Sequence, residues 1–245
     1  MRVISETPLA YRDLDTRLGG LLYQDEALSG PRPGILLVHG GAGLDDHAKD
    51  QARRYAALGY VVHACDMFGP GVAGDRERVI ACLTALRDDP ALLVRRVRAG
   101  LAALSDAPDT DGRVAAVGFC FGGMAVLALA RAGERLAGVA SIHGSLATSR
   151  PAEPGSVRAR VLVCHGALDP HVPLDHVTAF ADEMNQARAD WQLIMYGGAL
   201  HGFTHSRASA GHVPGVGYDP LADARSFAAT RDFLADAFAG CAGES

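Results

Sequence analysis

A cysteine flanked by glycines is the first feature of this sequence that could perform chemistry. Cys120 lies within Gly118-Phe119-Cys120-Phe121-Gly122, the pattern glycine–any–nucleophile–any–glycine. In this pattern the nucleophile occupies a sharp turn from a strand into a helix, and the turn is too tight for Cβ atoms at the glycine positions. The nucleophile then lies over a helix N-terminus, whose dipole favours a thiolate. The spacing therefore predicts a nucleophilic cysteine and disfavours the alternative, an ordinary buried cysteine.

Candidates for a general base and for the residue that orients it follow later in the chain. Asp169 comes after the apolar run that ends at Cys164, and His201 comes after the run that ends at Tyr196. In a catalytic triad made of Cys120, His201 and Asp169, His201 would take the proton of the cysteine, and Asp169 would hold the imidazole in one tautomer. The alternative interpretations are a turn-forming or helix-capping aspartate and a hydrogen-bonded loop histidine. The order nucleophile, acid, histidine favours the triad.

Acyl transfer also requires two backbone N–H groups that stabilise the oxyanion. One is expected from Phe121, the residue after the nucleophile, and the other from the loop after an early strand. The loop His39-Gly40-Gly41-Ala42-Gly43 fits that position, and Gly41 is the predicted second donor. The alternative is that these glycines only form a turn.

Two further patterns could be mistaken for binding sites. Residues 69–74 match the dinucleotide pattern GxGxxG, but they include Pro70 and lack a clear acidic partner on a following strand, so a loop is favoured. His201 and His205 lie four residues apart among loop-like residues, and the chain has no HExxH pair. We therefore expect no metal site and no nucleotide site.

Short apolar runs alternate along the chain with helix-length amphipathic segments. Continuous apolar runs are typical of buried parallel strands, because helices cover both faces of the sheet. The alternation predicts a single α/β domain over residues 1–245, with a mostly parallel central sheet and helices on both faces. The turn at Cys120 is typical of the α/β-hydrolase fold. The catalytic candidates follow strands, and ligands bind beyond the carboxyl ends of strands in such sheets. The expected elements are strands at 35–38, 60–64, 114–117, 139–142, 161–164 and 193–196, an antiparallel edge strand at 17–23, helices at 49–58, 124–132 and 220–238, and a surface excursion at 68–89.

Length and composition indicate a globular protein. The 245 residues, 49% hydrophobic and 21% charged, can bury a large core without disulfide or metal staples. The five cysteines show no CxxC spacing, so a disulfide framework and a cysteine-rich zinc site are not expected. The net charge of −5, the absence of a long apolar run and the lack of a signal-peptide pattern favour a cytoplasmic protein without nucleic-acid or membrane partners. The oligomeric state stays open.

From about residue 30 onward the chain resembles the dienelactone hydrolase family of α/β-hydrolases. The resemblance rests on Gly-Phe-Cys120-Phe-Gly-Gly, His-Gly-Ala-Leu-Asp169-Pro and Leu-His201-Gly-Phe, and extends to residues 60–69 and 218–238. It implies hydrolysis of a small-molecule ester or lactone through a thioester acyl-enzyme. It also implies that no metal or organic cofactor takes part.

Two positions depart from the founding type of this family. Its glutamate that pairs with the resting thiol corresponds here to Gly40, so the resemblance implies more direct activation of the cysteine by the histidine. Of its two substrate-binding arginines, the first could correspond to Arg76 or Arg78, and the second corresponds to His205. Because histidine is mostly neutral at pH 7 and lacks the planar fork that grips a carboxylate, we do not expect dienelactone itself to be the substrate.

Two alternatives to hydrolysis stay open at this point. An acyltransferase or a thioesterase could use the same triad, and nothing in the sequence separates transfer from hydrolysis. A non-catalytic ligand binder on a hydrolase scaffold is the other alternative. The complete set of Cys120, Asp169 and His201 argues against the binder, because a decayed site usually loses a member.

Overall fold

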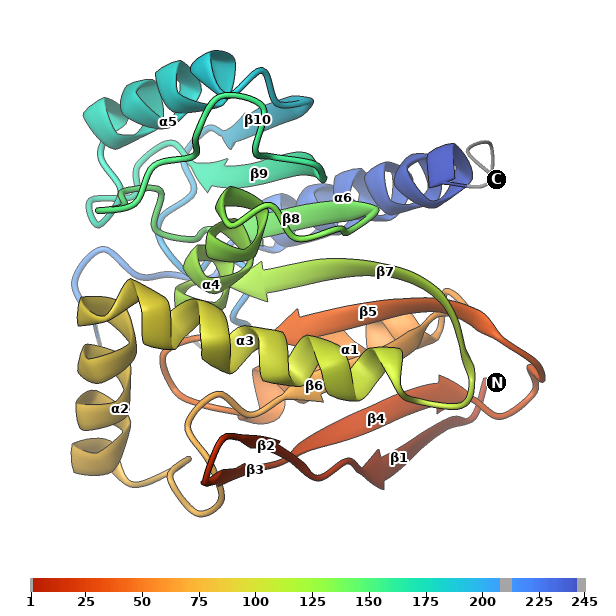
Figure 1. Ribbon diagram of the computed structural model, residues 1–245. Helices are drawn as coiled ribbons and strands as arrows, with labels where there is room; N and C mark the ends of the chain where they lie inside the picture. Colours follow the sequence, from red (N-terminus) through yellow and green to blue (C-terminus); the bar gives the residue numbers. More distant parts are fainter. Residues whose placement is uncertain (1, 208–212, 242–245) are drawn as a thin grey trace.

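A computed structural model describes residues 2–207 and 213–241 and contains an eight-stranded sheet (Figure 1). A separate hairpin is formed by β2 (Tyr11–Asp13) and β3 (Thr16–Leu18). The large sheet is mostly parallel, since β4 runs antiparallel to its two neighbours, β1 and β6, and the other neighbouring strands described pair in parallel. Its strands lie in the order β1 (Ile4–Pro8), β4 (Gly20–Asp25), β6 (Val61–Cys65), β5 (Arg32–Val38), β7 (Thr110–Phe119), β8 (Gly138–Ile142), β9 (Arg160–Gly166) and β10 (Trp191–Tyr196).

The six apolar runs predicted as parallel strands form β5 to β10. The antiparallel strand predicted at residues 17–23 corresponds mainly to β4, but β4 does not lie at the edge of the sheet. β1 pairs along its outer side, with Ile4 opposite Asp25. The residues of β1 are exposed or half-buried, so they carry little of the apolar pattern by which a strand is identified in a sequence.

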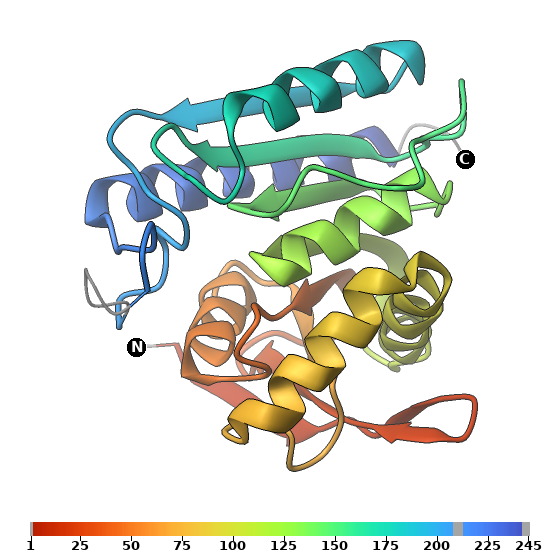
Figure 2. The ribbon, with the colours of Figure 1, turned by 90° about the vertical axis from the view of Figure 1, so that its left-hand side faces the viewer.

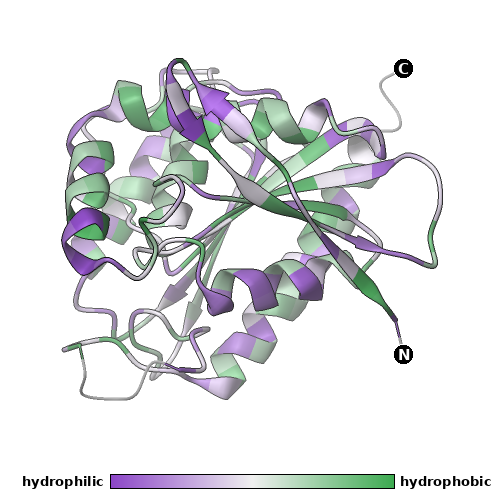
Figure 3. Ribbon diagram, turned by 90° about the horizontal axis from the view of Figure 1, so that it is seen from below, coloured by the Kyte–Doolittle hydropathy of each residue, from purple (hydrophilic) through white to green (hydrophobic). Residues whose placement is uncertain are grey.

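Helices cover both faces of the sheet (Figure 2). α1 (Asp46–Ala56) and α6 (Pro220–Cys241) pack on one face, and α3 (Pro90–Ser105), α4 (Phe121–Arg131) and α5 (Leu174–Gln186) pack on the other. Successive residues of β5 divide between the two cores: Leu37 lies in the core under α1 and α6, and Leu36 in the core under α3 and α4. The alternation follows from the two-residue period of a strand. Hydrophobic residues accordingly dominate the central strands (Figure 3).

The surface excursion predicted at residues 68–89 contains a helix that was not among the predicted elements. α2 (Arg76–Asp88) begins after Asp75, whose side chain accepts a hydrogen bond from the N–H of Arg78. Leu86 is the one buried residue of this helix. Val79, Cys82 and Leu83 are half-buried and pack against the core, and with Leu86 they follow the spacing of one face of an amphipathic helix. Residues 69–74, which match the dinucleotide pattern, form a loop as predicted.

The carboxyl ends of β5, β7, β8, β9 and β10 all lie at the same end of the sheet, on the left in Figure 1. Cys120 follows β7, Asp169 follows β9 and His201 follows β10. The fold therefore places the three loops that carry the candidate catalytic residues at this end of the sheet. None of the helices in the described ranges is long and apolar enough to cross a membrane.

Candidate active site

Cys120 occupies the sharp turn between β7 and α4. Its backbone has φ 53° and ψ −114°, a conformation that residues with a side chain rarely adopt and that occurs at functional sites. A Cβ atom on Gly118 would lie 2.0 Å from the carbonyl oxygen of Gly122, and a Cβ atom on Gly122 would lie 2.1 Å from that of Val38. The turn can therefore close only with glycine at both flanking positions.

Asp169 and His201 adjoin this cysteine in a continuous hydrogen-bonded chain. His201 Nε2 lies 3.1 Å from Cys120 Sγ, and His201 Nδ1 lies 2.7 Å from Asp169 Oδ2. The other carboxylate oxygen of Asp169 accepts the backbone N–H groups of His171 at 2.8 Å and Val172 at 3.2 Å. The structure thus brings together three residues from three separate loops. The two backbone N–H groups orient the side-chain carboxylate of Asp169.

The surroundings of the cysteine and the histidine favour a thiolate–imidazolium pair. Burial raises the pKa of Cys120, but the hydrogen bond and charge of His201, together with the backbone N–H groups of Gly41 and Phe121, bring that pKa below its ordinary value. Burial lowers the pKa of His201, but Asp169 and Cys120 raise it to about 10. Each partner therefore stabilises the charged form of the other.

The backbone N–H groups of the predicted oxyanion donors, Gly41 and Phe121, help to lower the pKa of Cys120. The N–H of Phe121 is available because a helix leaves its first N–H groups without intrahelical acceptors. His39 Nε2 accepts the N–H of Met67 at 3.0 Å, so His39 Nδ1 carries the proton and donates it to the carbonyl of Gly40 at 2.7 Å. Because that carbonyl and the N–H of Gly41 belong to one planar peptide, His39 orients the second donor.

The residues predicted to bind the substrate make other contacts. Arg76 and Arg78 are exposed, and Arg78 donates a hydrogen bond to the carbonyl of Gly71 at 2.8 Å. His205 Nε2 lies 3.3 Å from Asp45 Oδ2, and its ring stacks on that of His47 with centroids 4.7 Å apart. None of these contacts includes the cysteine or its hydrogen-bonded partners. A substrate-binding role for the three residues stays a prediction.

Asp45, His47 and His205 form a cluster of potential metal ligands, with donor atoms within 4.8 Å of one another. The two imidazole rings are stacked with an interplanar angle of 16°. A metal ion lies in the plane of each imidazole that binds it, and one ion cannot lie in two stacked planes. The cluster is therefore arranged for stacking and hydrogen bonding rather than for a shared metal ion.

A buried hydroxyl that the sequence analysis did not identify lies close to His201. Thr204 Oγ1 is 3.0 Å from His47 Nε2 and 2.9 Å from His143 Nε2. The ring of His143 packs edge-on against that of His201, with centroids 5.4 Å apart. No sequence motif predicts this arrangement, because His47, His143 and Thr204 come from three separate parts of the chain.

A groove of about 1080 Å³ runs along α4. Its floor includes Met124, Ala128 and Ala132, which continue at intervals of four residues from Cys120. Residues four apart lie on the same face of a helix, so Met124, the lining residue of α4 nearest in sequence to Cys120, lies about 6 Å along the helix from it. α3 forms one wall and residues 145–153 form the other.

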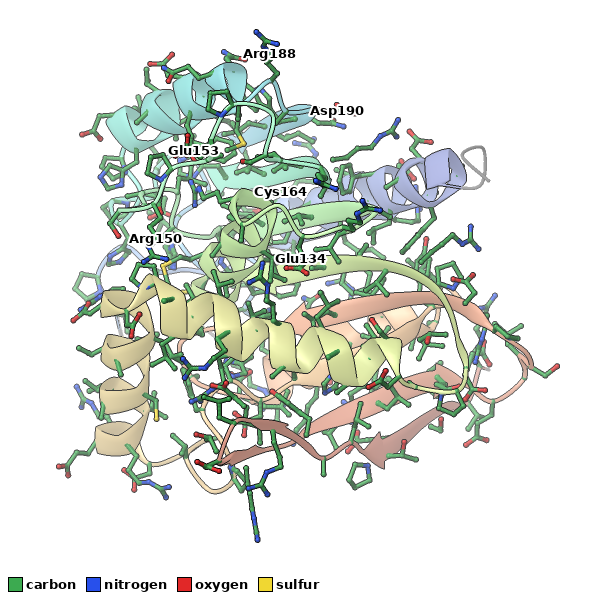
Figure 4. All side chains as sticks on the ribbon, viewed as in Figure 1. Glu134, Arg150, Glu153, Cys164, Arg188 and Asp190 are labelled. Atoms are coloured by element: carbon green, nitrogen blue, oxygen red, sulfur yellow. The ribbon has the colours of Figure 1, made fainter. Side chains whose placement is uncertain are left out.

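Five arginines line this groove, and four of them are paired with carboxylates. The pairs are Arg87 with Asp88, Arg95 with Asp13, Arg98 with Glu134 and Arg131 with Glu183. Arg150, on the wall opposite α3, is the lining arginine whose guanidinium has no partner among residues 2–207 and 213–241 (Figure 4). Among the described residues, Arg150 is therefore the lining arginine that is free to bind an anion.

Comparison with known proteins agrees with this architecture. Residues 18–238 match the model of the dienelactone hydrolase family. The chain is 40% identical over 149 residues to the uncharacterised Caenorhabditis elegans protein K02A2.1, which is 59% of this chain and 93% of the other. The solved structure m3DLH has a TM-score of 0.89 and 38% identity, and the alignment covers 96% of this chain and 98% of that one.

A second solved structure, the dienelactone hydrolase-like promiscuous phosphotriesterase P91 from metagenomic libraries, has a TM-score of 0.88 and 38% identity. That alignment covers 95% of this chain and 98% of P91. The expected family and the mostly parallel sheet with helices on both faces are confirmed. The chain belongs to the dienelactone hydrolase family and has the α/β-hydrolase fold of an ester or lactone hydrolase.

Proposed function

We propose that this protein hydrolyses a small carboxylic ester or lactone through a thioester acyl-enzyme on Cys120. The observation that carries the proposal is the continuous hydrogen-bonded chain from Cys120 Sγ through His201 to the buried carboxylate of Asp169. A thiolate is the reactive form of cysteine, and the hydrogen bond from His201 lowers the pKa of Cys120 and so favours that form.

In the first half-reaction the thiolate of Cys120 attacks the carbonyl carbon. A C–S bond forms, and the π electrons of the carbonyl move to its oxygen. The N–H groups of Gly41 and Phe121 donate hydrogen bonds to this oxyanion. When the intermediate collapses, the C–O bond breaks and the imidazolium of His201 gives its proton to the leaving alkoxide. A lactone substrate keeps that alkoxide attached to the acyl group.

In the second half-reaction water cleaves the thioester. Neutral His201 takes a proton from water, and the resulting hydroxide attacks the thioester carbonyl. The C–S bond then breaks, which releases the acid and restores the thiolate of Cys120 beside the imidazolium. Asp169 stays ionised throughout and stabilises the imidazolium.

The groove along α4 is the proposed location of the larger part of the substrate. Met124, Ala128 and Ala132 give it an apolar floor, and the guanidinium of Arg150 stands on its wall. A guanidinium forms bidentate hydrogen bonds with a carboxylate or a phosphate. An ester with an apolar body and an anionic end fits this combination best.

Hydrolysis of p-nitrophenyl acetate by the wild type and by Cys120→Ala tests the proposal. The wild type should release p-nitrophenol with an initial burst, and mass spectrometry of the quenched protein should place an acetyl group on the peptide that contains Cys120. Cys120→Ala should lose the burst and the adduct. An unchanged rate in a folded Cys120→Ala protein would remove the thiol from the reaction. Addition of competing alcohols separates hydrolysis from acyl transfer, because a transferase would give the new ester as its main product.

Phosphotriester hydrolysis is a second candidate activity because of the 38% identity to P91. The same thiolate would attack phosphorus, with the phosphoryl oxygen held by the N–H groups of Gly41 and Phe121. An S–P bond would form as the P–O bond to the leaving aryloxide breaks, and water, deprotonated by His201, would then cleave the S–P bond to release the phosphodiester. Release of p-nitrophenol from diethyl p-nitrophenyl phosphate tests this activity. If the site is shared, Cys120→Ala should abolish both activities.

A further inference from the structure

The loop that carries His201 is anchored by the side chains that follow it. Phe203 and Thr204 are almost completely buried, with 0% and 3% of their surface exposed. The ring of Phe203 packs edge-on against that of His143, with centroids 5.1 Å apart. The N–H of His205 closes the turn with a hydrogen bond of 2.8 Å to the carbonyl of Gly202. A displacement of Thr204 would therefore be transmitted to His201, three residues earlier.

The hydroxyl of Thr204 lies between two imidazole rings from different elements. His47 belongs to α1, which follows the loop that contains Gly41, and His143 follows β8. The backbone of His143 has φ 42°, which is uncommon for a residue with a side chain. The hydroxyl of Thr204 thus connects the loop that carries His201 to the end of β8, through His143, and to α1, through His47.

The directions of the two hydrogen bonds follow from the donors available. A threonine hydroxyl has one proton to donate and can also accept. His143 Nδ1 is buried and has no partner in the described part of the chain. Buried N–H groups without an acceptor are rare, so the proton of His143 belongs on Nε2 and is donated to Thr204. Thr204 then donates its own proton to Nε2 of His47.

Both rings in this chain of hydrogen bonds are neutral at pH 7. Burial, followed by the charges of His201 and His47, lowers the pKa of His143 well below its ordinary value. Burial lowers the pKa of His47 to about 4. A neutral ring at position 143 adds no positive charge beside the imidazolium of His201.

We propose that Thr204 is a positioning residue for the reaction: by accepting from His143 and donating to His47, its hydroxyl holds His201 in register with Cys120. This inference rests on the proposed role of Cys120 as the nucleophile. Thr204 acts through His201, and the 3% exposure of its side chain keeps it away from substrate.

Several other titratable groups surround His201. Cys120 faces His201 from the turn after β7, Asp169 and His171 face it from the loop after β9, and His165 from the end of β9 itself. Loss of the Thr204 hydroxyl alters none of these groups directly. It releases His143 and the backbone of the histidine loop, so the thiolate should become less stable because His201 moves.

Thr204→Val, which replaces the hydroxyl by a methyl group, and Thr204→Ser, which keeps it, form the test. The first readout is the rate of alkylation of Cys120 by iodoacetamide against pH, followed by mass spectrometry, which needs no substrate. The second is kcat/KM for p-nitrophenyl acetate. Thr110→Val is the matched control, because Thr110 donates to the carbonyl of Ala107 at the amino end of β7, far from the site.

Thr204→Val should move the alkylation midpoint to higher pH and lower kcat/KM by about 10- to 100-fold, the effect of a small misplacement of a catalytic group. Thr204→Ser should restore both values, and Thr110→Val should change neither. A wild-type midpoint in Thr204→Val, or a loss in Thr204→Ser as large as in Thr204→Val, would overturn the proposal. If Thr204→Val does not fold, Thr204→Ala gives the same comparison. Failure of the proposed function would look different, because Cys120 of the wild type would then show no thiolate below the ordinary thiol range.

Discussion

His201 Nε2 lies 3.1 Å from Cys120 Sγ although the two residues are 81 positions apart in the chain. The contact helps to lower the pKa of the thiol, and together with Asp169 it raises the pKa of the imidazole to about 10. Under the proposed function, this pair would hold Cys120 in its reactive form before a substrate arrives. The following predictions concern the groups that maintain this pair and the groove beside it.

Activity should follow a bell-shaped pH profile. The rate should rise as the thiol ionises, at a pH below its ordinary range, because the pKa of Cys120 is lowered. It should fall again as the pH rises through about 10, where His201 loses the proton that the leaving alkoxide needs. Measurement of kcat/KM for p-nitrophenyl acetate from pH 5 to 11 checks both limbs. A profile centred on the ordinary histidine pKa of about 6.5 would contradict the ion pair.

Asp169→Asn should reduce kcat/KM by about 10²- to 10⁴-fold. The carboxylate raises the pKa of His201 and selects the tautomer with a proton on Nδ1, and an amide does neither. The same kinetic assay measures the loss. Asp175→Asn, in the first turn of α5, is the control for removing a charge and should leave the rate unchanged. A loss below threefold in Asp169→Asn would show that the carboxylate has no role in the reaction.

Gly118→Ala should destabilise the protein by about 3 kcal/mol or more, because the new Cβ would lie 2.0 Å from the carbonyl oxygen of Gly122. Urea unfolding followed by circular dichroism measures the change in free energy of unfolding. Gly19→Ala provides the comparison, since a Cβ at that position meets nothing within 4 Å. Equal stability of the two variants would mean that the turn at Cys120 can open without cost.

Arg150→Gln should weaken the binding of anionic esters selectively. The guanidinium of Arg150 has no partner in the part of the chain that the structure describes, so its loss should raise KM about tenfold for the p-nitrophenyl monoester of succinic acid and leave p-nitrophenyl butyrate unaffected. Arg231→Gln, an exposed arginine of α6, is the matched control. An equal effect of Arg150→Gln on both substrates would exclude recognition of the anionic end.

Filling the groove should separate small from large substrates. Ala128→Trp places an indole on the floor of the groove, about 12 Å along α4 from Cys120. The rate with p-nitrophenyl octanoate should fall while the rate with p-nitrophenyl acetate stays close to that of the wild type. Unchanged hydrolysis of the octanoate would place the acyl chain outside the groove.

Local patterns predicted the central strands, but not every element that lies near the surface. β5 to β9 are buried on both faces, so their sequences contain continuous apolar runs. β1 has no buried residue and leaves no apolar period in the sequence, and α2 has apolar residues at helical spacing of which only Leu86 is fully buried. Such elements are held by a cap or by a neighbouring strand, which a single sequence does not display.

The chain order of Cys120, Asp169 and His201, and the glycines around the first of them, are determined by the sequence itself, because a turn without room for Cβ atoms constrains residue types locally. The tertiary structure alone decided the 3.1 Å contact, the orientation of Gly41 by His39 and the position of Thr204 between two histidines. These depend on which strands are neighbours in the sheet. Packing across the whole chain sets that order, so no local spacing encodes it.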